Sequence, residues 1–316
     1  MKMMTKTAAF LGAALFCLSG CSARFITAGT GVKYKNAEKY TAGDCEITGK
    51  IDALDIDWPS GSVEVKVSDG DTVTVKETTK ADLEDDLKVH SWADGSVLRV
   101  RFCKSGTNYR KSESKTLEIT VPEGTLFETV TADTASAELT CTGLKAKTVD
   151  LDAASGTLRY TGTADTFRAD AASGNVVFSG EARVIKTDTA SGNVTVDLTG
   201  RNESISADTA SGKMNISAEQ PGKISADSAS GDQSFRLNAV PQEMNLDSAS
   251  GDVCIYLPED AGFTADISTA SGTVQSEMPL TKSGNGTYTC GSGGSKIEVD
   301  TASGDVSIMK LRGEAE

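Results

Sequence analysis

The sequence predicts an all-β protein, namely a β-solenoid in which two-stranded rungs of a single chain stack as in a parallel β-helix. The first observation is a five-residue motif, Asp-x-Ala-Ser-Gly, that returns at a near-constant spacing. Its copies, including a weaker first one and one that begins with Ser, start at residues 133, 152, 170, 188, 208, 227, 247, 268 and 300. Self-similarity at such a period is typical of stacked repeats.

Two further observations support the same fold. Apolar residues alternate with period two on both sides of the motif, which indicates strands. Aromatic residues make up only 5% of the chain, which fits a thin core between two facing sheets. A β-sandwich is the alternative, because short strands at regular spacing also indicate one.

Each repeat is expected to form a strand, a tight turn, a second strand and a looser turn. Around Asp208, Ile205 and Ala207 precede the motif and Met214 and Ile216 follow it, which is strand spacing and not helix spacing. The near-constant Gly predicts a corner with positive φ, a conformation that Gly adopts readily. Because a two-stranded unit cannot bury its own apolar face, we expect parallel stacking with rungs about 4.8 Å apart.

Residues 1–21 are expected to be an export signal. Lys2 and Lys6 precede an apolar run over residues 8–18, which is too short to span a bilayer as a stable helix. The run ends in Leu-Ser-Gly-Cys21, which resembles the lipobox of bacterial lipoproteins. In those proteins the Cys receives diacylglycerol and becomes the new N-terminus, so the resemblance implies lipidation at Cys21. Anchoring by more than one acyl chain is stable. The expected location is the outer face of the cell membrane, or the outer membrane of an envelope that has two.

The rest of the chain divides into four segments. Residues 22–44 are polar without clear periodicity and are expected to be a flexible tether. Residues 45–125 carry strand patterns, an outlying copy of the repeat and one short helical stretch, and are expected to form an irregular β cap. Residues 126–310 contain the regular solenoid repeats, and residues 311–316 form a charged tail.

A flap over residues 279–296 lengthens the last repeat step. Asn285-Gly286 within it predicts a hairpin turn. The final rung, residues 297–308, is expected to follow the flap at the end of the stack.

The net charge of −14 limits the classes of partner that the chain is expected to bind. Nucleic acid and anionic lipid both attract Lys and Arg, so such an acidic chain is not expected to bind either. The sequence leaves the oligomeric state open.

Five cysteines remain after the signal segment. Cys141 occupies an inward column and is expected to be a buried apolar residue. The cap holds Cys45 and Cys103, whereas Cys254 lies in an outward column that the flap with Cys290 could cover. In an exported protein the pairs Cys45–Cys103 and Cys254–Cys290 are possible disulfides, although the sequence does not fix connectivity.

No set of residues in the sequence indicates catalysis. The single histidine, His90, lies in the cap without the context of a nucleophile elbow. No glycine-rich phosphate loop and no cluster of Cys and His with zinc spacing is present. We therefore predict no enzymatic activity, no catalytic residue and no cofactor.

The aspartates that open the motifs form the one column with functional potential. In a stack they lie a rung apart, where two carboxylates repel by roughly 0.9 kcal/mol even in a water-like dielectric. One interpretation is that each Asp accepts hydrogen bonds from the amides of its own turn. The other is a calcium row, although repeat calcium binders use a motif richer in Gly. That row would consist of Asp152, Asp170, Asp188, Asp208, Asp227 and Asp247.

Taken together, the lipobox, the cap, the Asp-x-Ala-Ser-Gly-x-Val repeats and the terminal Thr-Ala-Ser-Gly-Asp-Val-x-Ile rung resemble a known family. It is the bacterial putative-adhesin family of β-strand-repeat domains of unknown function, and the resemblance covers residues 45–308. It implies a β-solenoid, an envelope location and no known catalytic residues. The five cysteines of the mature chain depart from that pattern.

The expected function is that of a non-enzymatic lipoprotein acting as an adhesin or an envelope scaffold, with an envelope glycan or a surface protein as partner. One alternative is an accessory protein of an envelope-stress response. Another is a polysaccharide-active β-helix enzyme, in which carboxylates and Arg or Lys would break the repeat pattern in one groove. No such cluster is visible in the sequence.

Overall fold

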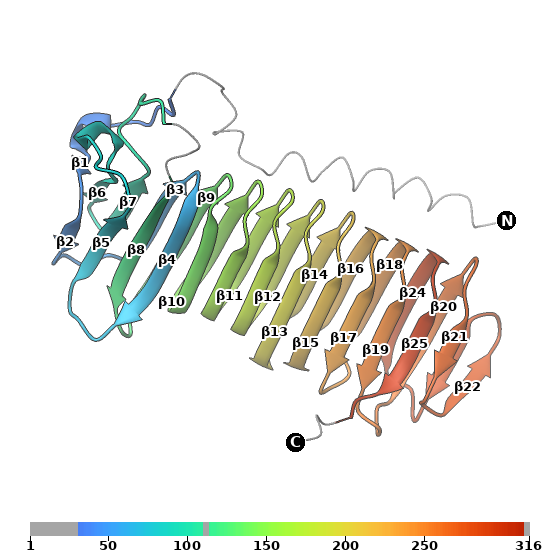
Figure 1. Ribbon diagram of the computed structural model, residues 1–316. Coiled ribbons are helices and arrows are strands. Elements are labelled where there is room, and N and C mark those ends of the chain that lie inside the picture. Colours follow the sequence, from blue (N-terminus) through green and yellow to red (C-terminus); the bar gives the residue numbers. More distant parts are fainter. Residues whose placement is uncertain (1–30, 110–113, 313–316) are drawn as a thin grey trace. The chain divides into compact units, whose positions relative to one another are not determined.

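The computed structural model describes residues 31–109 and 114–312, and it is all-β, as the sequence predicts (Figure 1). The chain separates into two compact units between Gly174 and Asn175. We call residues 31–174 the N-terminal unit and residues 175–312 the C-terminal unit. The signal segment, with the expected lipidation site Cys21, lies outside the described residues.

The N-terminal unit consists of two faces of mainly parallel strands. On the first face the order is β1–β6–β7–β3–β9–β10–β11, and on the second it is β2–β5–β8–β4–β10–β11. The long strands β10 and β11 pass from the second face to the first. The bounds are β1 (Thr41–Ala42), β2 (Cys45–Ile47), β3 (Ala53–Trp58), β4 (Gly61–Ser68), β5 (Val73–Thr78), β6 (His90–Asp94), β7 (Val97–Arg101), β8 (Lys115–Pro122), β9 (Leu126–Thr134), β10 (Glu138–Ala153) and β11 (Leu158–Ala171).

The C-terminal unit repeats this arrangement with shorter strands. One face has the order β12–β14–β16–β18–β24–β20, and the other has β12–β13–β15–β17–β19–β25–β21. All of these pairings are parallel. The bounds are β12 (Val176–Thr189), β13 (Val194–Arg201), β14 (Ser204–Thr209), β15 (Met214–Gln220), β16 (Lys223–Ser230), β17 (Gln233–Leu237), β18 (Glu243–Ser250), β19 (Val253–Leu257), β20 (Phe263–Thr269), β21 (Val274–Ser276), β22 (Leu280–Ser283), β23 (Thr287–Cys290), β24 (Ser295–Ser303) and β25 (Val306–Lys310).

Within each unit, equivalent residues of successive rungs pair with one another, which confirms the solenoid and excludes the sandwich. Ile205 pairs with Ile224, and Ile224 pairs with Met244. The inward columns of Val, Ile, Leu and Phe are buried, and so is Cys141, as predicted. Burying such columns is the main favourable term for a repeat that has no core of its own.

The order of the rungs differs from the prediction in one respect. The last strand pair in the chain, β24–β25, lies between β18–β19 and β20–β21 and not at the end of the stack. The flap forms the predicted hairpin, β22–β23, and β23 adds to β20 in antiparallel orientation. In the N-terminal unit β3–β4 likewise lies between β7–β8 and β9–β10.

The reason for Gly in the motif also differs from the prediction. Among the motif glycines from Gly156 to Gly304 only Gly251 has a positive φ, of 147°, whereas Gly156, Gly174, Gly212 and Gly231 do not. A Cβ on Gly212, however, would lie 1.8 Å from the carbonyl oxygen of Gly192 in the preceding rung, and one on Gly231 would lie 2.0 Å from that of Gly212. Gly is therefore required because the stacked corners leave no room for a side chain.

The prediction of a flexible tether over residues 22–44 is wrong for residues 31–44, the part that the structure describes. Residues 31–42 pack onto the cap through Tyr40, which is buried, and through β1, which pairs with β6. A short 3-10 helix, η2 (Ala37–Lys39), directly precedes Tyr40. The predicted helical stretch of the cap contracts to a second 3-10 helix, η3 (Asp85–Leu87).

Neither of the possible disulfides Cys45–Cys103 and Cys254–Cys290 is formed. The Sγ atom of Cys45 instead lies 3.2 Å from the hydroxyl oxygen of Ser91. Cys290 is buried in β23 opposite Phe263, whereas Cys254 lies half-exposed on β19. Over residues 31–109 and 114–312, no helix has the length and apolar character needed to cross a membrane.

Candidate functional site

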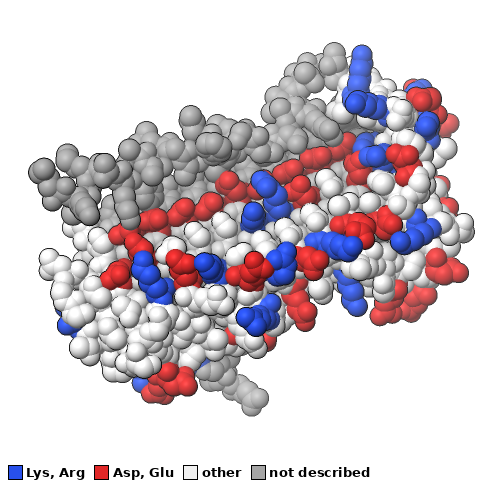
Figure 2. Space-filling model, turned by 180° about the vertical axis from the view of Figure 1, so that it is seen from behind, with Lys and Arg blue, Asp and Glu red and all other residues white. Residues whose placement is uncertain are grey.

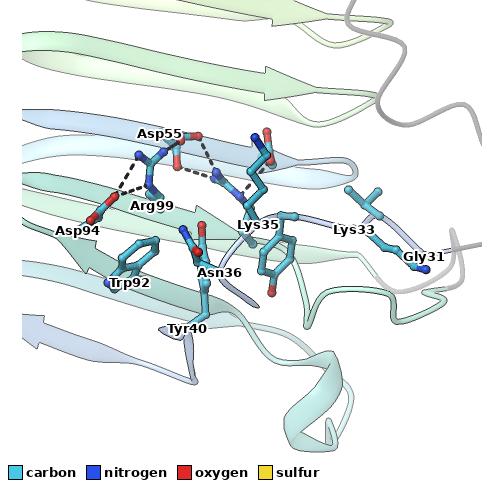
Figure 3. A pocket seen from close by; sticks show the side chains of 13 residues that line it. Gly31, Lys33, Lys35, Asn36, Tyr40, Asp55, Trp92, Asp94 and Arg99 are labelled. Atoms are coloured by element: carbon cyan, nitrogen blue, oxygen red, sulfur yellow. Dashed lines mark hydrogen bonds and ion pairs between the residues drawn. The ribbon is translucent and has the colours of Figure 1, made fainter. Parts of the chain in front are cut away.

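The candidate site is a pocket of about 710 Å³ in the N-terminal unit (Figure 3). One wall is the segment over residues 31–40, and the other is the outward side of β3, β6 and β7. The volume is within the range of small-ligand sites, roughly 300–1,000 Å³. The pocket belongs to the cap and not to the regular repeats.

Aromatic rings line one part of the pocket. The ring centroids of Tyr34 and Tyr40 are 4.7 Å apart, and those of Tyr40 and Trp92 are 5.6 Å apart in an edge-to-face arrangement. Such contacts fix the rings relative to one another. The Nζ atom of Lys39 lies 5.0 Å from the centroid of Trp92. Burial raises the pKa of Tyr34 to about 12, so its hydroxyl stays protonated at neutral pH.

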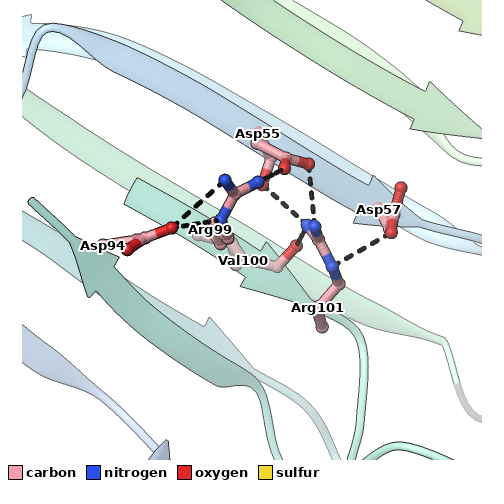
Figure 4. A network of polar contacts seen from close by, with 6 residues as sticks. All are labelled: Asp55, Asp57, Asp94, Arg99, Val100 and Arg101. Carbon is pink, nitrogen blue, oxygen red and sulfur yellow. Dashed lines mark hydrogen bonds and ion pairs between the residues drawn. The ribbon is translucent and has the colours of Figure 1, made fainter. Parts of the chain in front are cut away.

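Charged side chains from two adjacent strands form the floor (Figure 4). Asp55 on β3 is opposite Arg99 on β7. Two residues further along, Asp57 is opposite Arg101. The period of two places all four on the same side of the sheet. Parallel pairing in this register therefore builds the cluster from an Asp-x-Asp and an Arg-x-Arg sequence.

The ion pairs join these side chains into one network. The Nη2 atom of Arg101 lies 2.9 Å from Oδ1 of Asp55, and its Nε atom lies 3.0 Å from Oδ2 of Asp57. The other oxygen of Asp55 bonds to Arg99, which also contacts Asp94 of β6 at 3.3 Å. Arg101 further donates to the backbone oxygens of Asp55 and Val100. Mutual ion pairs of this kind hold side chains in fixed orientations.

Asp57 is the least satisfied member of the network. Its side chain is buried, and its Oδ1 atom has no hydrogen-bond partner among the described residues. Burial raises the pKa of Asp57 to about 6; Arg101 opposes that shift, and the charge of Asp133 in the neighbouring rung adds to it. The residue therefore titrates close to neutral pH.

The segment over residues 31–40 contributes the rim. Asn36 is exposed and has a left-handed backbone with φ of 53°, which Asn tolerates better than most residues. Its side chain makes no capping hydrogen bond to η2. Lys33 and Lys35 are also exposed at the rim.

This site does not follow from the sequence patterns above. The residues of the rim were expected to form a tether, and no off-pattern cluster of carboxylates and Arg was recognised. The signal that could have found the cluster is the pair of alternating charged sequences at residues 55–57 and 99–101, both of which interrupt strands with outward charges. His90, the single histidine, is buried, with Nδ1 3.0 Å from the backbone oxygen of Lys88.

The predicted Asp column exists within each unit. In the N-terminal unit, Asp57 pairs with Asp133, and the row continues through Asp152 to Asp170. In the C-terminal unit the register brings together Asp188, Asp208, Asp227, Asp247 and Asp300. Figure 2 shows acidic side chains gathered in rows across the strands.

The turn-capping role predicted for these aspartates is wrong where the turn amides can be followed. The amides of Ser230 and Gly231 donate to the backbone oxygens of Ala210 and Ser250 in the adjacent rungs, not to Asp227. The amides of Ser136, Ser155 and Ser173 likewise donate to backbone oxygens of other rungs.

The register instead brings the carboxylates close together. Burial, and then the charges of neighbouring aspartates, raise the pKa of Asp152 and of Asp208 to about 7. We infer that these two side chains are partly protonated at neutral pH. No group of three or more Asp, Glu, His or Cys side chains that could hold a metal ion occurs in the part of the chain that the structure describes.

A different residue supports the turns. The side chain that follows the motif Gly accepts a hydrogen bond from the backbone of the next rung, as Asn193 does from the amide of Lys213 at 2.9 Å. At the end of the chain, Asp252 accepts from the amide of Asp305 at 2.9 Å, and Asp305 accepts from that of Thr273 at 2.7 Å. This order again places the rung of β24–β25 in the middle.

The two faces, the repeat register and the cap correspond to a known family. A family model described as Toastrack DUF4097 matches residues 51–309, which is most of the chain. The chain belongs to this family. Its members share a domain whose function is not established.

Several solved structures are similar to this chain. One, described as a putative lipid binding protein from Parabacteroides distasonis, has 14% identity, a TM-score of 0.48 and coverage of 86% of this chain and 97% of that one. A second, described as a putative adhesin from Bacteroides fragilis, has 16% identity, a TM-score of 0.45 and coverage of 68% and 95%. A third, described as a putative cell adhesion protein from Clostridium sporogenes, has 11% identity, a TM-score of 0.23 and coverage of 86% and 100%. No curated protein matches the chain.

Proposed function

We propose that this Toastrack protein is a non-enzymatic lipoprotein of the cell envelope, anchored through Cys21, that acts in adhesion or as an envelope scaffold. Its repeats serve as a scaffold, and its cap binds the partner. One observation carries the proposal: the pocket with rigid aromatic and charged walls lies in the cap, where the repeat pattern is broken. Residues in the regular repeats are constrained by packing, whereas residues in segments that break the repeat pattern can be used for binding.

A polysaccharide-active enzyme is the second candidate, because the Asp and Arg cluster of the pocket is the kind of off-pattern group that such an enzyme needs. Its carboxylates are poorly suited to catalysis, however. Both oxygens of Asp55 bind guanidinium groups, and one oxygen of Asp57 binds Arg101. A general base or nucleophile needs a free lone pair directed at the substrate. The network therefore supports binding better than it supports catalysis.

The anchor is tested by changing Cys21 to Ala in the full chain. We expect the protein to leave the membrane fraction, or to remain unprocessed, and to lose incorporation of a labelled fatty acid. Cys17→Ala is the matched control and should change neither result. Unchanged fractionation and labelling in the Cys21→Ala variant would contradict the proposed anchor.

Binding by the cap is tested on whole cells that carry the anchored protein. Cells with the wild-type chain should be retained on immobilised envelope material and extracellular surface proteins more strongly than cells with a Trp92→Ala chain at equal surface abundance. Equal retention of the two, on every surface tried, would contradict a binding role for the cap.

A further inference from the structure

We propose that the pocket of the cap binds an uncharged oligosaccharide, with one sugar ring against Trp92 and its hydroxyl groups on the Asp–Arg network. This inference rests on the proposed function only in that a glycan is one of the partners which that function allows. The structure supports it through three independent features, namely the aromatic wall, the rigid polar floor and the charge of the lining.

The aromatic wall offers a surface for the apolar face of a sugar. A pyranose ring exposes C–H groups on its faces and hydroxyl groups at its edge. It therefore packs well on an aromatic side chain that is surrounded by polar groups. Trp92 is half-exposed at the pocket, and its contact with buried Tyr40 holds it in place. A rigid aromatic side chain loses little conformational freedom on binding.

The polar floor offers both donors and acceptors at fixed positions. Asp94 keeps acceptor capacity beyond its single pair with Arg99, and both of these side chains are partly exposed. The amide of exposed Asn36 adds a donor and an acceptor at the rim. Adjacent sugar hydroxyls can donate to a carboxylate and accept from a guanidinium or amide at once. Such a floor needs no reorganisation before it binds.

The charge of the lining favours an uncharged ligand over an ionic one. The carboxylates of Asp55, Asp57 and Asp94 are already paired with the guanidinium groups of Arg99 and Arg101. A charged group of a ligand seated on this floor would have to break one of these pairs, and this would leave a charge without its partner. A polyhydroxy ligand keeps every pair intact.

The intrinsic fluorescence of the protein reports directly on this site. The chain has two tryptophans, and Trp58 is completely buried, so Trp92 is the one that a ligand or a quencher can reach. We would titrate the full chain, in mild detergent, with cellotetraose, chitotetraose and mannotetraose as uncharged probes. Tetragalacturonate and tetralysine would serve as acidic and basic probes. Acrylamide quenching and calorimetry would give the affinities.

We expect at least one uncharged probe to protect Trp92 from acrylamide and to release or absorb heat, with clearly weaker binding of both charged probes. Trp92→Ala should reduce affinity by roughly tenfold or more, as the loss of a central aromatic contact does. Asn36→Gly should reduce it by a few-fold without loss of fold, because Gly accepts the left-handed backbone at this position. Tyr256→Ala is the matched control, an aromatic side chain beneath Arg236 in the C-terminal unit, and should have no effect.

Failure of all three uncharged probes to bind would overturn the inference, and so would binding that Trp92→Ala and Asn36→Gly leave unchanged. Binding of a charged probe alone would overturn the proposed ligand class. These results leave the adhesion test on whole cells unaffected, so the two proposals can fail separately. Release of new reducing ends from a bound probe would support sugar binding and contradict the non-enzymatic function.

Discussion

The two units place a strand pair in the same unusual position but close their stacks in different ways. In each unit, one pair of strands is inserted between two rungs that do not neighbour it in the sequence. This pair is β3–β4 in the N-terminal unit and β24–β25 in the C-terminal unit. The N-terminal unit then adds antiparallel strands that enclose buried charges and a pocket. The C-terminal unit adds only the polar hairpin β22–β23.

This difference separates what the fold needs from what a site needs. Both closures protect edge strands, whose unpaired backbone would otherwise attract other chains. Only the N-terminal closure has a buried lysine, Lys115, at the position where a regular rung has the motif Gly. Buried charges are costly for a fold and are retained where they serve a specific arrangement. The candidate site accordingly lies in the cap.

The largest expected effect concerns the inserted pair of the C-terminal unit. Ending the chain after residue 294 removes β24 and β25, which separate β18–β19 from β20–β21. The strands β21 and β20 then lose their parallel partners, so we expect loss of a cooperative thermal transition and rapid proteolysis within residues 175–294.

The matched control ends the chain after residue 310. It removes the hydrogen bond from the amide of Leu311 to the backbone oxygen of Leu257 and the exposed pair between Arg312 and Glu277, and it should lower the melting temperature only slightly. Equal melting curves for the two truncations would show that the inserted pair is not central to the unit.

The next effect concerns the buried charge of the cap. The Nζ atom of Lys115 lies 2.7 Å from a carboxylate oxygen of Glu77 and 2.7 Å from the backbone oxygen of Leu87, and both side chains are almost fully buried. Lys115→Met leaves Glu77 without its partner, which costs about 3–5 kcal/mol in comparable cases. Chemical denaturation would measure the loss.

Lys213→Met supplies the comparison from the C-terminal unit. Lys213 pairs with Asp232 at 2.9 Å, but both side chains are more than half exposed. An exposed pair of this kind contributes about 0–1 kcal/mol. If Lys115→Met cost no more than Lys213→Met, the ion pair in the cap would have no structural importance.

The regular repeats were predictable because each column repeats the same residue type many times. The period, the inward columns and the hairpin at Asn285-Gly286 all follow from local patterns. The position of β24–β25 did not follow, because every rung carries the same columns and can therefore pair with any other. The hydrogen bonds that Asn193 and Asp252 accept from the next rung could have been predicted, because an Asn or Asp often follows the motif Gly. The more regular Asp at the start of the motif drew attention away from this position.

The cap was less predictable because its contacts join segments that are distant in sequence. Tyr34, Tyr40 and Trp92 meet only because β1 pairs with β6. The network of Arg101 likewise depends on the register of β3 against β7. Neither pairing has a repeated motif to indicate it.

A smaller effect distinguishes two reasons for Gly. Gly212→Ala places a Cβ 1.8 Å from the backbone oxygen of Gly192, and the stacked rung cannot move away without separating from its neighbours. We expect a loss of about 1–3 kcal/mol or more, the cost of overpacking. Gly49→Ala is the control, because a Cβ there meets nothing within 4 Å. Similar melting temperatures for the two variants would contradict close stacking at the corners.

The smallest expected effect is the pH dependence of the Asp rows, which both units share. The pKa of Asp208 is raised to about 7 by burial and by the charges of Asp227 and Asp188. In the unfolded chain an Asp has a pKa of about 3.9. Between these values the folded protein holds a proton that the unfolded chain has lost, so the free energy of unfolding falls as pH rises from about 4 to 7.

We therefore expect a higher melting temperature at pH 5 than at pH 8, and a weaker dependence in Asp208→Asn, whose amide carries no charge at any pH. At pH 8 the same variant should be more stable than wild type by on the order of 1–2 kcal/mol, after allowance for screening at a partly exposed group. Asp197→Asn, on an outward-facing, exposed position of β13, should leave the slope unchanged. Millimolar calcium at pH 8 tests the predicted calcium row in the same experiment. A rise in melting temperature with calcium that Asp208→Asn abolishes would mean that the row binds the cation and does not relieve its repulsion by holding protons.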